Sequence, residues 1–194
     1  MDNGFRVQDL CQLRAACALG RTFRYVFFPD CGTISDPLTA SCLSQWAITP
    51  FESQGISFHS AEQAMMHGKA LLFGDLDMAE NIRASRTPFG AKNLGGKVRG
   101  FSESTWIRHR FEVVVEANLP KFATNSVLRE FLMSTGESIL VEASPTDLVW
   151  GNGLDQFDKA SIHPDQWPGL NLLGFALMEV RVRLGGATGA TADP

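Results

Sequence analysis

Apolar positions recur with the period of an α-helix along most of the chain, and short apolar or alternating runs separate the helical stretches. The short runs predict strands at 25–28, 139–143 and 148–150, and a strand or hairpin at 48–58 that turns at Gln54-Gly55. The helical period predicts helices at 9–20, 60–74, 77–84, 87–94, 104–119, 128–133 and 171–184. No internal repeat and no linker divides this series, so one folding unit is expected.

The helix predicted at 60–74 has a defined start and carries a charged pair. Ser60 is a suitable N-cap, and Gln63 can complete a capping box with it. On a helical wheel, Glu62 and Lys69 lie on the flank of the apolar stripe, about 10 Å apart along the axis. The pair is either a carboxylate and an amine at the edge of a site, or a solvated flank whose glutamate suits the helix N-terminus.

Two segments are expected to be irregular. Residues 154–170 form a predicted long loop, and loops of this length in a compact domain are often functional or lid-like. Residues 185–194 are small and polar, so a disordered tail is expected there. The domain is therefore expected to span 1–184, with 1–24 as an N-terminal helical extension.

The composition narrows the class of protein. The 194 residues are 44% hydrophobic and 20% charged, which suits one globular domain with a real core. With 17 basic and 21 acidic residues the net charge is −4, which argues against a general nucleic-acid coat or a binder of anionic membranes. The cysteines form no C-x-x-C pair, and no secretory signal and no run of about 20 apolar residues is visible. A reducing, cytoplasmic location is expected.

One stretch is nevertheless basic. Residues 83–110 contain Arg and Lys at seven positions and only one acidic residue, Glu103. This stretch flanks two predicted short helices, and helix N-termini also attract anions. It is either a phosphate or pyrophosphate pocket or a solvated face.

Trp150-Gly151-Asn152-Gly153 combines an aromatic ring with glycines that allow close backbone approach. It is either a corner on which a flat ligand stacks or a buried Trp before a turn. The four histidines show no metal-ligand spacing, so no metal site is expected. The chain has no G-x-S-x-G, P-loop or G-x-G-x-x-G pattern, so serine hydrolase, P-loop nucleotidase and dinucleotide oxidoreductase functions lack their residues.

A series of motifs follows in a recognisable order along the chain. They are Leu43-Ser44-Gln45-Trp46, Ser60-Ala61-Glu62-Gln63 with Lys69, Pro88 to Gly95, Trp106 with Arg110, Lys121-Phe122, Leu140 to Ser144, Asp147, Trp150 to Gly153, Asn171 to Gly174, and Leu177 to Arg181. In order and spacing they resemble the NADAR family, the YbiA-like N-glycosidases, over about residues 27–184.

The resemblance implies a single, mostly helical α+β domain with a few short strands. It also implies an N-glycosidase acting on ribosylated bases, with no cofactor and no metal. Family activities include cleaving ribosylamino-pyrimidine 5'-phosphates of the riboflavin pathway and removing ADP-ribose from guanine. The implied partners are therefore a small ribosylated base, or ADP-ribosylated guanine in a nucleoside or nucleic acid, and not a membrane.

The motif positions also imply the site. Glu62 and Lys69 match the acidic and lysine positions of the family, so they are the predicted catalytic residues. The predicted substrate-binding residues are Trp46, Lys92, Trp106, Arg110, Asp147, Trp150, Gly151, Gly153 and Asn171. Two departures leave the substrate open, because Gln63 stands where many members have His and the segment between Gly153 and Asn171 is longer than in compact bacterial members.

Two mechanisms are compatible with this pair. Lys69, if burial keeps it neutral, could trap the ribosyl C1' as a Schiff base while Glu62 moves protons. Alternatively, Glu62 acts as the acid and base without a covalent step, and Lys69 contacts a phosphate or hydroxyl. The rival functions are a non-catalytic ADP-ribose or nucleotide-binding module and a purely structural interaction protein, and the oligomeric state is open.

Overall fold

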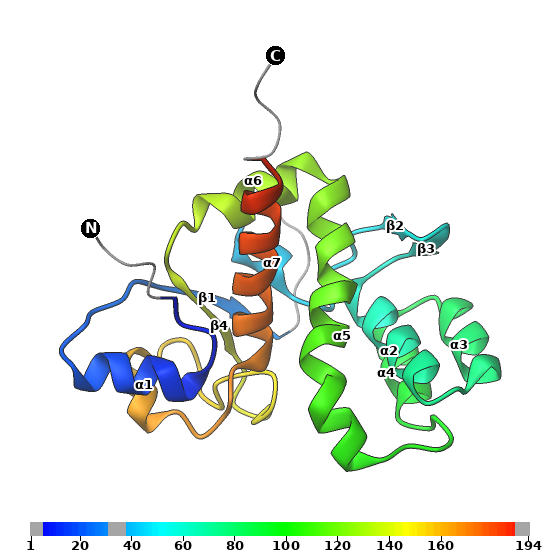
Figure 1. Ribbon diagram of the computed structural model, residues 1–194, viewed down its shortest axis with the longest axis horizontal. Coiled ribbons are helices and arrows are strands. Elements are labelled where there is room, and N and C mark those ends of the chain that lie inside the picture. Colours follow the sequence, from blue (N-terminus) through cyan, green and yellow to red (C-terminus); the bar gives the residue numbers. More distant parts are fainter. Residues whose placement is uncertain (1–5, 31–37, 189–194) are drawn as a thin grey trace.

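The computed structural model describes residues 6–30 and 38–188 (Figure 1). The elements follow one another as α1 (Leu10–Ala18), β1 (Tyr25–Pro29), η1 (Ala40–Leu43), β2 (Phe51–Ser53), β3 (Ile56–Phe58), α2 (Ala61–Leu72), α3 (Leu76–Arg83), α4 (Pro88–Gly95), α5 (Glu103–Thr124), α6 (Ser126–Ser134), β4 (Ile139–Ala143), η2 (Lys159–Ile162), η3 (Pro164–Gln166) and α7 (Leu172–Thr188). One contiguous core of buried apolar side chains runs from Val7 to Leu184. The fold is therefore the predicted mostly helical α+β domain with a few short strands.

The long helix α5 stands in the middle of the molecule (Figure 1). It packs against α7 on one side and against α2 on the other, and α3 and α4 pack on α2. Helix α7 in turn covers β4. The core is thus built mainly by α2, α5 and α7, with fully buried side chains such as Phe122 and Leu177.

The described strands form two pairs, one parallel and one antiparallel. Strands β1 and β4 are parallel, with Phe28 opposite Glu142. Because parallel strands end at the same edge, the residues that follow β1 and β4 come together there. Strands β2 and β3 form the predicted hairpin, in which Gln54 and Gly55 both have positive φ angles (52° and 76°), as the tight turn requires.

The predicted start of α2 is confirmed. The Ser60 hydroxyl accepts a hydrogen bond from the backbone N–H of Gln63 at 3.3 Å, and the Gln63 side chain accepts one from the N–H of His59 at 2.9 Å. The Gln63 amide also donates to the carbonyls of Ile82 and Arg83. Gln63 therefore joins the first turn of α2 to the end of α3.

The start of α3 and the end of α5 differ from the predicted boundaries. Helix α3 begins after Asp75, whose carboxylate accepts the N–H of Met78 at 3.3 Å, and not after Asp77. Helix α5 continues past Leu119 to Thr124 with Pro120 inside it. Lys121 and Phe122, which follow Pro120, are fully buried, and their packing in the core holds the last turn of the helix in place.

The predicted strand at 148–150 is absent. The Asp147 carboxylate accepts the N–H groups of Val149 (2.9 Å) and Trp150 (2.8 Å), so these groups are committed to a local turn. The predicted irregular loop at 154–170 contains the two short 3-10 helices η2 and η3. Helix α7 passes the predicted end at Leu184 and reaches Thr188, and the rest of the expected disordered tail lies outside the described residues.

The N-terminal segment joins the core. Leu13 of α1 is fully buried, and the Arg14 guanidinium donates to the carbonyls of Pro164 and Trp167, at 2.8 Å each. The boundaries expected at 24 and 184 stay predictions. Within the described residues, no helix has the length and apolar character needed to cross a membrane.

Candidate active site

A cavity of about 310 Å³ opens at the shared edge where β1 and β4 end. Residues from six parts of the chain surround it, which brings together segments far apart in sequence. They are Asp30, Gln45, Trp46, Glu62, Met65, Met66, Lys92, Glu142, Thr146, Asp147, Trp150 and Leu173. Of the sequence-predicted site residues, Glu62, Trp46, Lys92, Asp147 and Trp150 line this cavity.

Glu62 is the buried acid of α2 at this cavity. Glu62 is only 3% exposed, and its Oε1 atom has no hydrogen-bond partner. Burial raises the pKa of this carboxyl to about 7, and Asp147 adds to the rise, while Lys92 and Lys69 oppose it. Glu62 can therefore lose or gain a proton near neutral pH, as a general acid or base must.

Glu142 is a second buried carboxyl that the sequence analysis did not select. It is 4% exposed, lines the same cavity, and its Oε2 atom has no partner. Burial raises its pKa to about 8, with further rises from Asp147, Asp30 and Glu62. The signal was present, because a glutamate interrupts the apolar strand Ile139–Ala143.

Two aspartates complete the acidic lining. Asp30 follows β1, and its carboxylate accepts a hydrogen bond from the Ser144 hydroxyl at 2.7 Å. Asp147 is held by the turn that ends at Trp150. Asp30 was also missed by the sequence analysis, because it becomes part of a site only when β1 pairs with β4. Among the described residues, no three His, Cys, Asp or Glu side chains are arranged to hold a metal ion.

Two aromatic rings and one exposed amine also line the cavity. The Lys92 ammonium lies 5.2 Å from the ring centroid of Trp46. Trp150 lines the cavity, and Trp106 of α5 packs edge-on against it with 6.4 Å between the ring centroids. Trp106 itself is not a lining residue, so it supports the position of Trp150.

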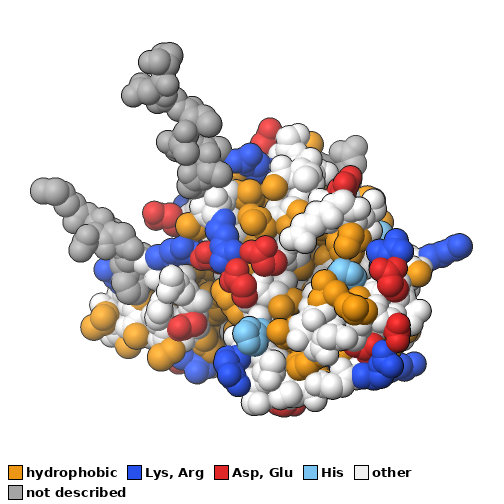
Figure 2. Space-filling view, turned by 45° about the vertical axis from the view of Figure 1, so that its right-hand side comes forward, with side chains coloured by type: hydrophobic (Ala, Val, Ile, Leu, Met, Phe, Trp, Pro, Cys, Tyr) orange, Lys and Arg blue, Asp and Glu red, His pale blue; other side chains and the backbone are white. Residues whose placement is uncertain are grey.

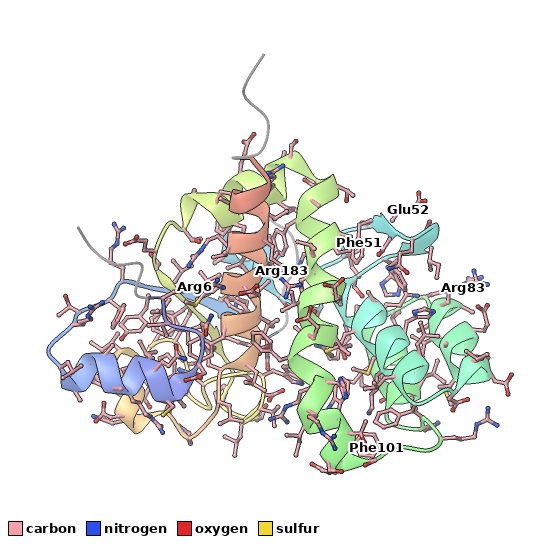
Figure 3. The ribbon with its side chains drawn as sticks, in the orientation of Figure 1. Arg6, Phe51, Glu52, Arg83, Phe101 and Arg183 are labelled. Atoms are coloured by element: carbon pink, nitrogen blue, oxygen red, sulfur yellow. The ribbon has the colours of Figure 1, made fainter. Side chains whose placement is uncertain are left out.

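Lys69 lies next to this wall and not in the lining. Its ammonium donates to the carbonyl of Gly95 at 2.9 Å, and it lies 4.6 Å from the Phe101 ring and 5.4 Å from the Trp106 ring. Burial lowers the pKa of Lys69, and the negative charge of Glu62 opposes that change. Figure 3 shows Phe101 just before the start of α5. Lys69 thus contacts the aromatic cluster that continues into Trp150.

Three of the predicted binding residues make close contacts within the protein itself. A Cβ atom on Gly151 would lie 3.0 Å from the Glu142 carbonyl, and one on Gly153 would lie 2.6 Å from Pro168. These glycines therefore allow two segments of the chain to approach each other closely. Asn171 is fully buried, and its amide accepts from the N–H of Glu142 (3.0 Å) and donates to the carbonyl of Leu140 (2.9 Å). Asn171 therefore positions β4, and its expected contact with substrate stays a prediction.

The basic stretch at 83–110 does not gather into one phosphate pocket. Arg83 pairs with Glu80 at 2.6 Å, and Arg99 pairs with Asp75 at 2.5 Å and with Asp77. Figure 3 shows Arg83 on the outer side of α3. Of this stretch only Lys92 lines the cavity, and Arg110 of α5 does not. The local charge count missed these pairings because the acidic partners lie outside or at the edge of the stretch.

A second cavity of about 310 Å³ lies between the β2–β3 hairpin, α2 and α5. Most of its lining is apolar, and its acidic residues Glu112 and Glu116 are bonded to Arg183, at 2.9 Å each. Figure 2, which turns the side with the hairpin and α3 forward, shows basic side chains beside acidic ones on this face. The unpartnered buried carboxyls, in contrast, lie in the first cavity, which is therefore the candidate active site.

Comparisons with known proteins agree with this fold. The model of the NADAR domain matches residues 34–185. The chain is 39% identical over 165 residues to the N-glycosidase R617 of Acanthamoeba polyphaga mimivirus, covering 82% of this chain and 96% of that protein. It is 34% identical over 121 residues to the riboflavin biosynthesis protein PYRR of Zea mays, covering 60% of this chain and 18% of that protein. The NMR structure of the E. coli protein YbiA is similar, with a TM-score of 0.67 and 23% identity over 89% of this chain and 92% of that one. The chain therefore belongs to the NADAR family.

Proposed function

We propose that this protein is an N-glycosidase that hydrolyses the C–N bond between a ribose and a base. The observation that carries the proposal is Glu62, a buried carboxyl with a free oxygen facing a cavity walled by Trp46 and Trp150. The name of the viral relative, an N-glycosidase, supports the same reaction. The candidate substrates are ADP-ribosylated guanine, free or in nucleic acid, and a ribosylamino-pyrimidine phosphate. The name of the maize relative, a riboflavin biosynthesis protein, favours the second.

The cavity offers the groups that this reaction needs. Cleavage of a ribosyl C–N bond requires stabilisation of positive charge at C1' and a proton for the leaving base. An ionised Glu62 stabilises the charge at C1', and a Trp ring provides a face on which the base stacks. Lys92, exposed at the rim beside Trp46, is the positive group that a phosphate would meet.

Lys69 has two proposed roles that an experiment separates. As a nucleophile it would leave the carbonyl of Gly95 and bond to C1' while the bond from C1' to the base breaks and the base nitrogen takes a proton, and opening of the ribose ring would then give the Schiff base; the lowered pKa of Lys69 favours the neutral amine that this needs. As a supporting group it would keep its present contacts and hold Trp106, and through it Trp150, in place. Substrate with borohydride traps a Schiff base as a stable adduct on Lys69 in the first case only. An adduct that persists in Lys69→Ala would exclude the covalent role.

The function is tested by a mass-spectrometric assay of base release. The purified protein is incubated with ADP-ribosylated guanosine, an ADP-ribosylated oligonucleotide and a ribosylamino-pyrimidine phosphate. We expect release of free base from one of them, and a loss of about 10²–10⁴-fold in rate in Glu62→Gln. Thermal stabilisation by ADP-ribose without any base release would instead indicate the non-catalytic binding module.

A further inference from the structure

The backbone of Glu142 is hydrogen-bonded on both sides, yet its Oε2 atom has no hydrogen-bond partner. Its backbone N–H donates to Asn171 at 3.0 Å, and its carbonyl accepts from the N–H of Asn152 at 2.9 Å. In register it lies opposite Phe28 of β1. The side chain, in contrast, ends at the cavity with its Oε2 atom buried and unpartnered.

A buried carboxyl without a hydrogen-bond partner destabilises the folded state. Burying a polar group without a hydrogen bond costs about 1–3 kcal/mol on the protein mutational scale, and an ionised one costs more. No described side chain forms an ion pair with Glu142. Groups kept in such positions inside a cavity are typical of functional sites.

The charged groups around Glu142 come from every side of the cavity. They are Asp30 after β1, Glu62 of α2, Lys92 of α4 and Asp147 in the loop that follows β4. Three of these four are acidic, and the only cation is exposed at the rim. Burial raises the pKa of both Glu62 and Glu142, and the charge of Glu62 adds to the rise at Glu142, so the two carboxyls resist being ionised together. The pair then offers one acid and one base at the same time.

We propose that Glu142 is a second catalytic carboxyl of this cavity, which gives its proton to the base as the base leaves, while the ionised Glu62 acts on the C1' side. The proposal rests on the proposed N-glycosidase function and adds a proton donor to it. It also explains why Asn171 and Asn152 fix the backbone of this one strand residue.

The step balances with water as the only co-reactant. The C1'–N bond breaks, its electron pair goes to the base nitrogen, and that nitrogen takes the proton of Glu142. A water oxygen bonds to C1', and the proton that it loses passes to Glu62. The two carboxyls together hold one proton before and after the step, and its return from Glu62 to Glu142 restores the starting state.

The decisive measurement is the pH profile of base release by wild type and Glu142→Gln. In wild type we expect a bell-shaped profile, because the rate requires an ionised Glu62 (pKa about 7) and a protonated Glu142 (pKa about 8). In Glu142→Gln we expect a rate about 10²–10⁴-fold lower and no decline on the alkaline side. A rate within about 10-fold of wild type, or an unchanged alkaline decline, would overturn the proposal.

Measurements of the unfolding free energy distinguish a variant that has lost its proton donor from one that fails to fold. Glutamine has no proton to lose, so Glu142→Gln should gain stability relative to wild type as the pH rises through the interval from 4.5 to about 8, where the buried carboxyl resists ionisation. If Glu142→Gln does not fold, Glu142→Asp retains the carboxyl with a shorter reach. We then expect a lower rate that keeps an alkaline decline, and an unchanged rate would contradict the donor role.

The matched control is Glu52→Gln, the same substitution in another strand. Glu52 is exposed in β2, and Figure 3 shows it on the outer side of the hairpin. Its variant should keep the wild-type rate and profile. If wild type itself releases no base, the proposed function fails and the donor proposal falls with it. If wild type and Glu52→Gln release base and Glu142→Gln does so at a rate within about 10-fold of theirs, only the role of Glu142 is wrong.

Discussion

Asn171 provides a direct test of the difference between a substrate contact and a residue that builds the site. Its side chain joins the N–H of Glu142 to the carbonyl of Leu140, and it is fully buried at the start of α7. Replacement by Ala leaves both backbone groups buried and unpaired, at about 1–3 kcal/mol each. The φ angle of 53° adds about 1 kcal/mol, because Ala resists this left-handed conformation. The expected loss is therefore about 5 kcal/mol of unfolding free energy.

This loss is measurable by urea unfolding with linear extrapolation, or as a fall in Tm. For a chain of this length, 5 kcal/mol corresponds to a fall of roughly 10–20 °C. Asn93→Ala is the control, because Asn93 is exposed in α4 and its substitution should change stability by about 0.5 kcal/mol or less. A loss under about 1.5 kcal/mol in Asn171→Ala, combined with a raised KM, would refute the structural role and restore the substrate contact.

Three further predictions concern stability. Ser60→Ala removes the cap of α2 and should lower the unfolding free energy by about 1 kcal/mol in a urea titration. Gly174→Ala should lower it by about 3 kcal/mol, because a Cβ atom there would lie 2.0 Å from the Leu140 carbonyl, and wild-type stability in that variant would show that α7 can shift. Lys121 is fully buried, and burial lowers its pKa from 10.5 to about 7. Between these two pH values the unfolded chain binds more protons than the folded one, so the unfolding free energy of wild type increases as the pH rises. Lys121→Met should therefore be favoured relative to wild type more at about pH 6 than at about pH 9, and a difference independent of pH would contradict the depressed pKa.

Local signals account for what the sequence predicted well. The start of α2 follows from two side chains three residues apart, and the hairpin turn follows from Gln54-Gly55, so neither depends on distant parts of the chain. The position of Glu62 beside an apolar stripe left a solvated flank open, and Glu62 was chosen because the motif around it resembles that of the NADAR family. These features are encoded within one or two turns of backbone.

The missed features depend on contacts between distant segments. Asp30 and Ser144 are 114 residues apart in sequence, and they meet only because β1 and β4 pair in parallel. Glu142 becomes a cavity residue through the same pairing. For the basic stretch the sequence left a phosphate pocket and a solvated face open, and the deciding ion pairs are not local, since Arg99 folds back on Asp75, 24 residues earlier. A count of charges along the chain does not reveal which of them are already neutralised.

The long segment 154–170, which the sequence suggested as a functional or lid-like loop, is packed firmly against the domain. Its two ends are pinned together, because Gly169 donates to the Asn152 carbonyl at 2.9 Å and a Cβ atom on Gly169 would lie 2.3 Å from the Gly151 carbonyl. The chain therefore leaves the cavity wall at Gly153 and returns to the same place, so the length of the segment can change without moving Trp150. The segment itself is anchored by Trp167, which is 2% exposed. Arg14 of α1 binds two carbonyls of this segment, so the segment and the N-terminal helix support one another beside a site in which Asn171, at the start of α7, fixes the backbone of β4.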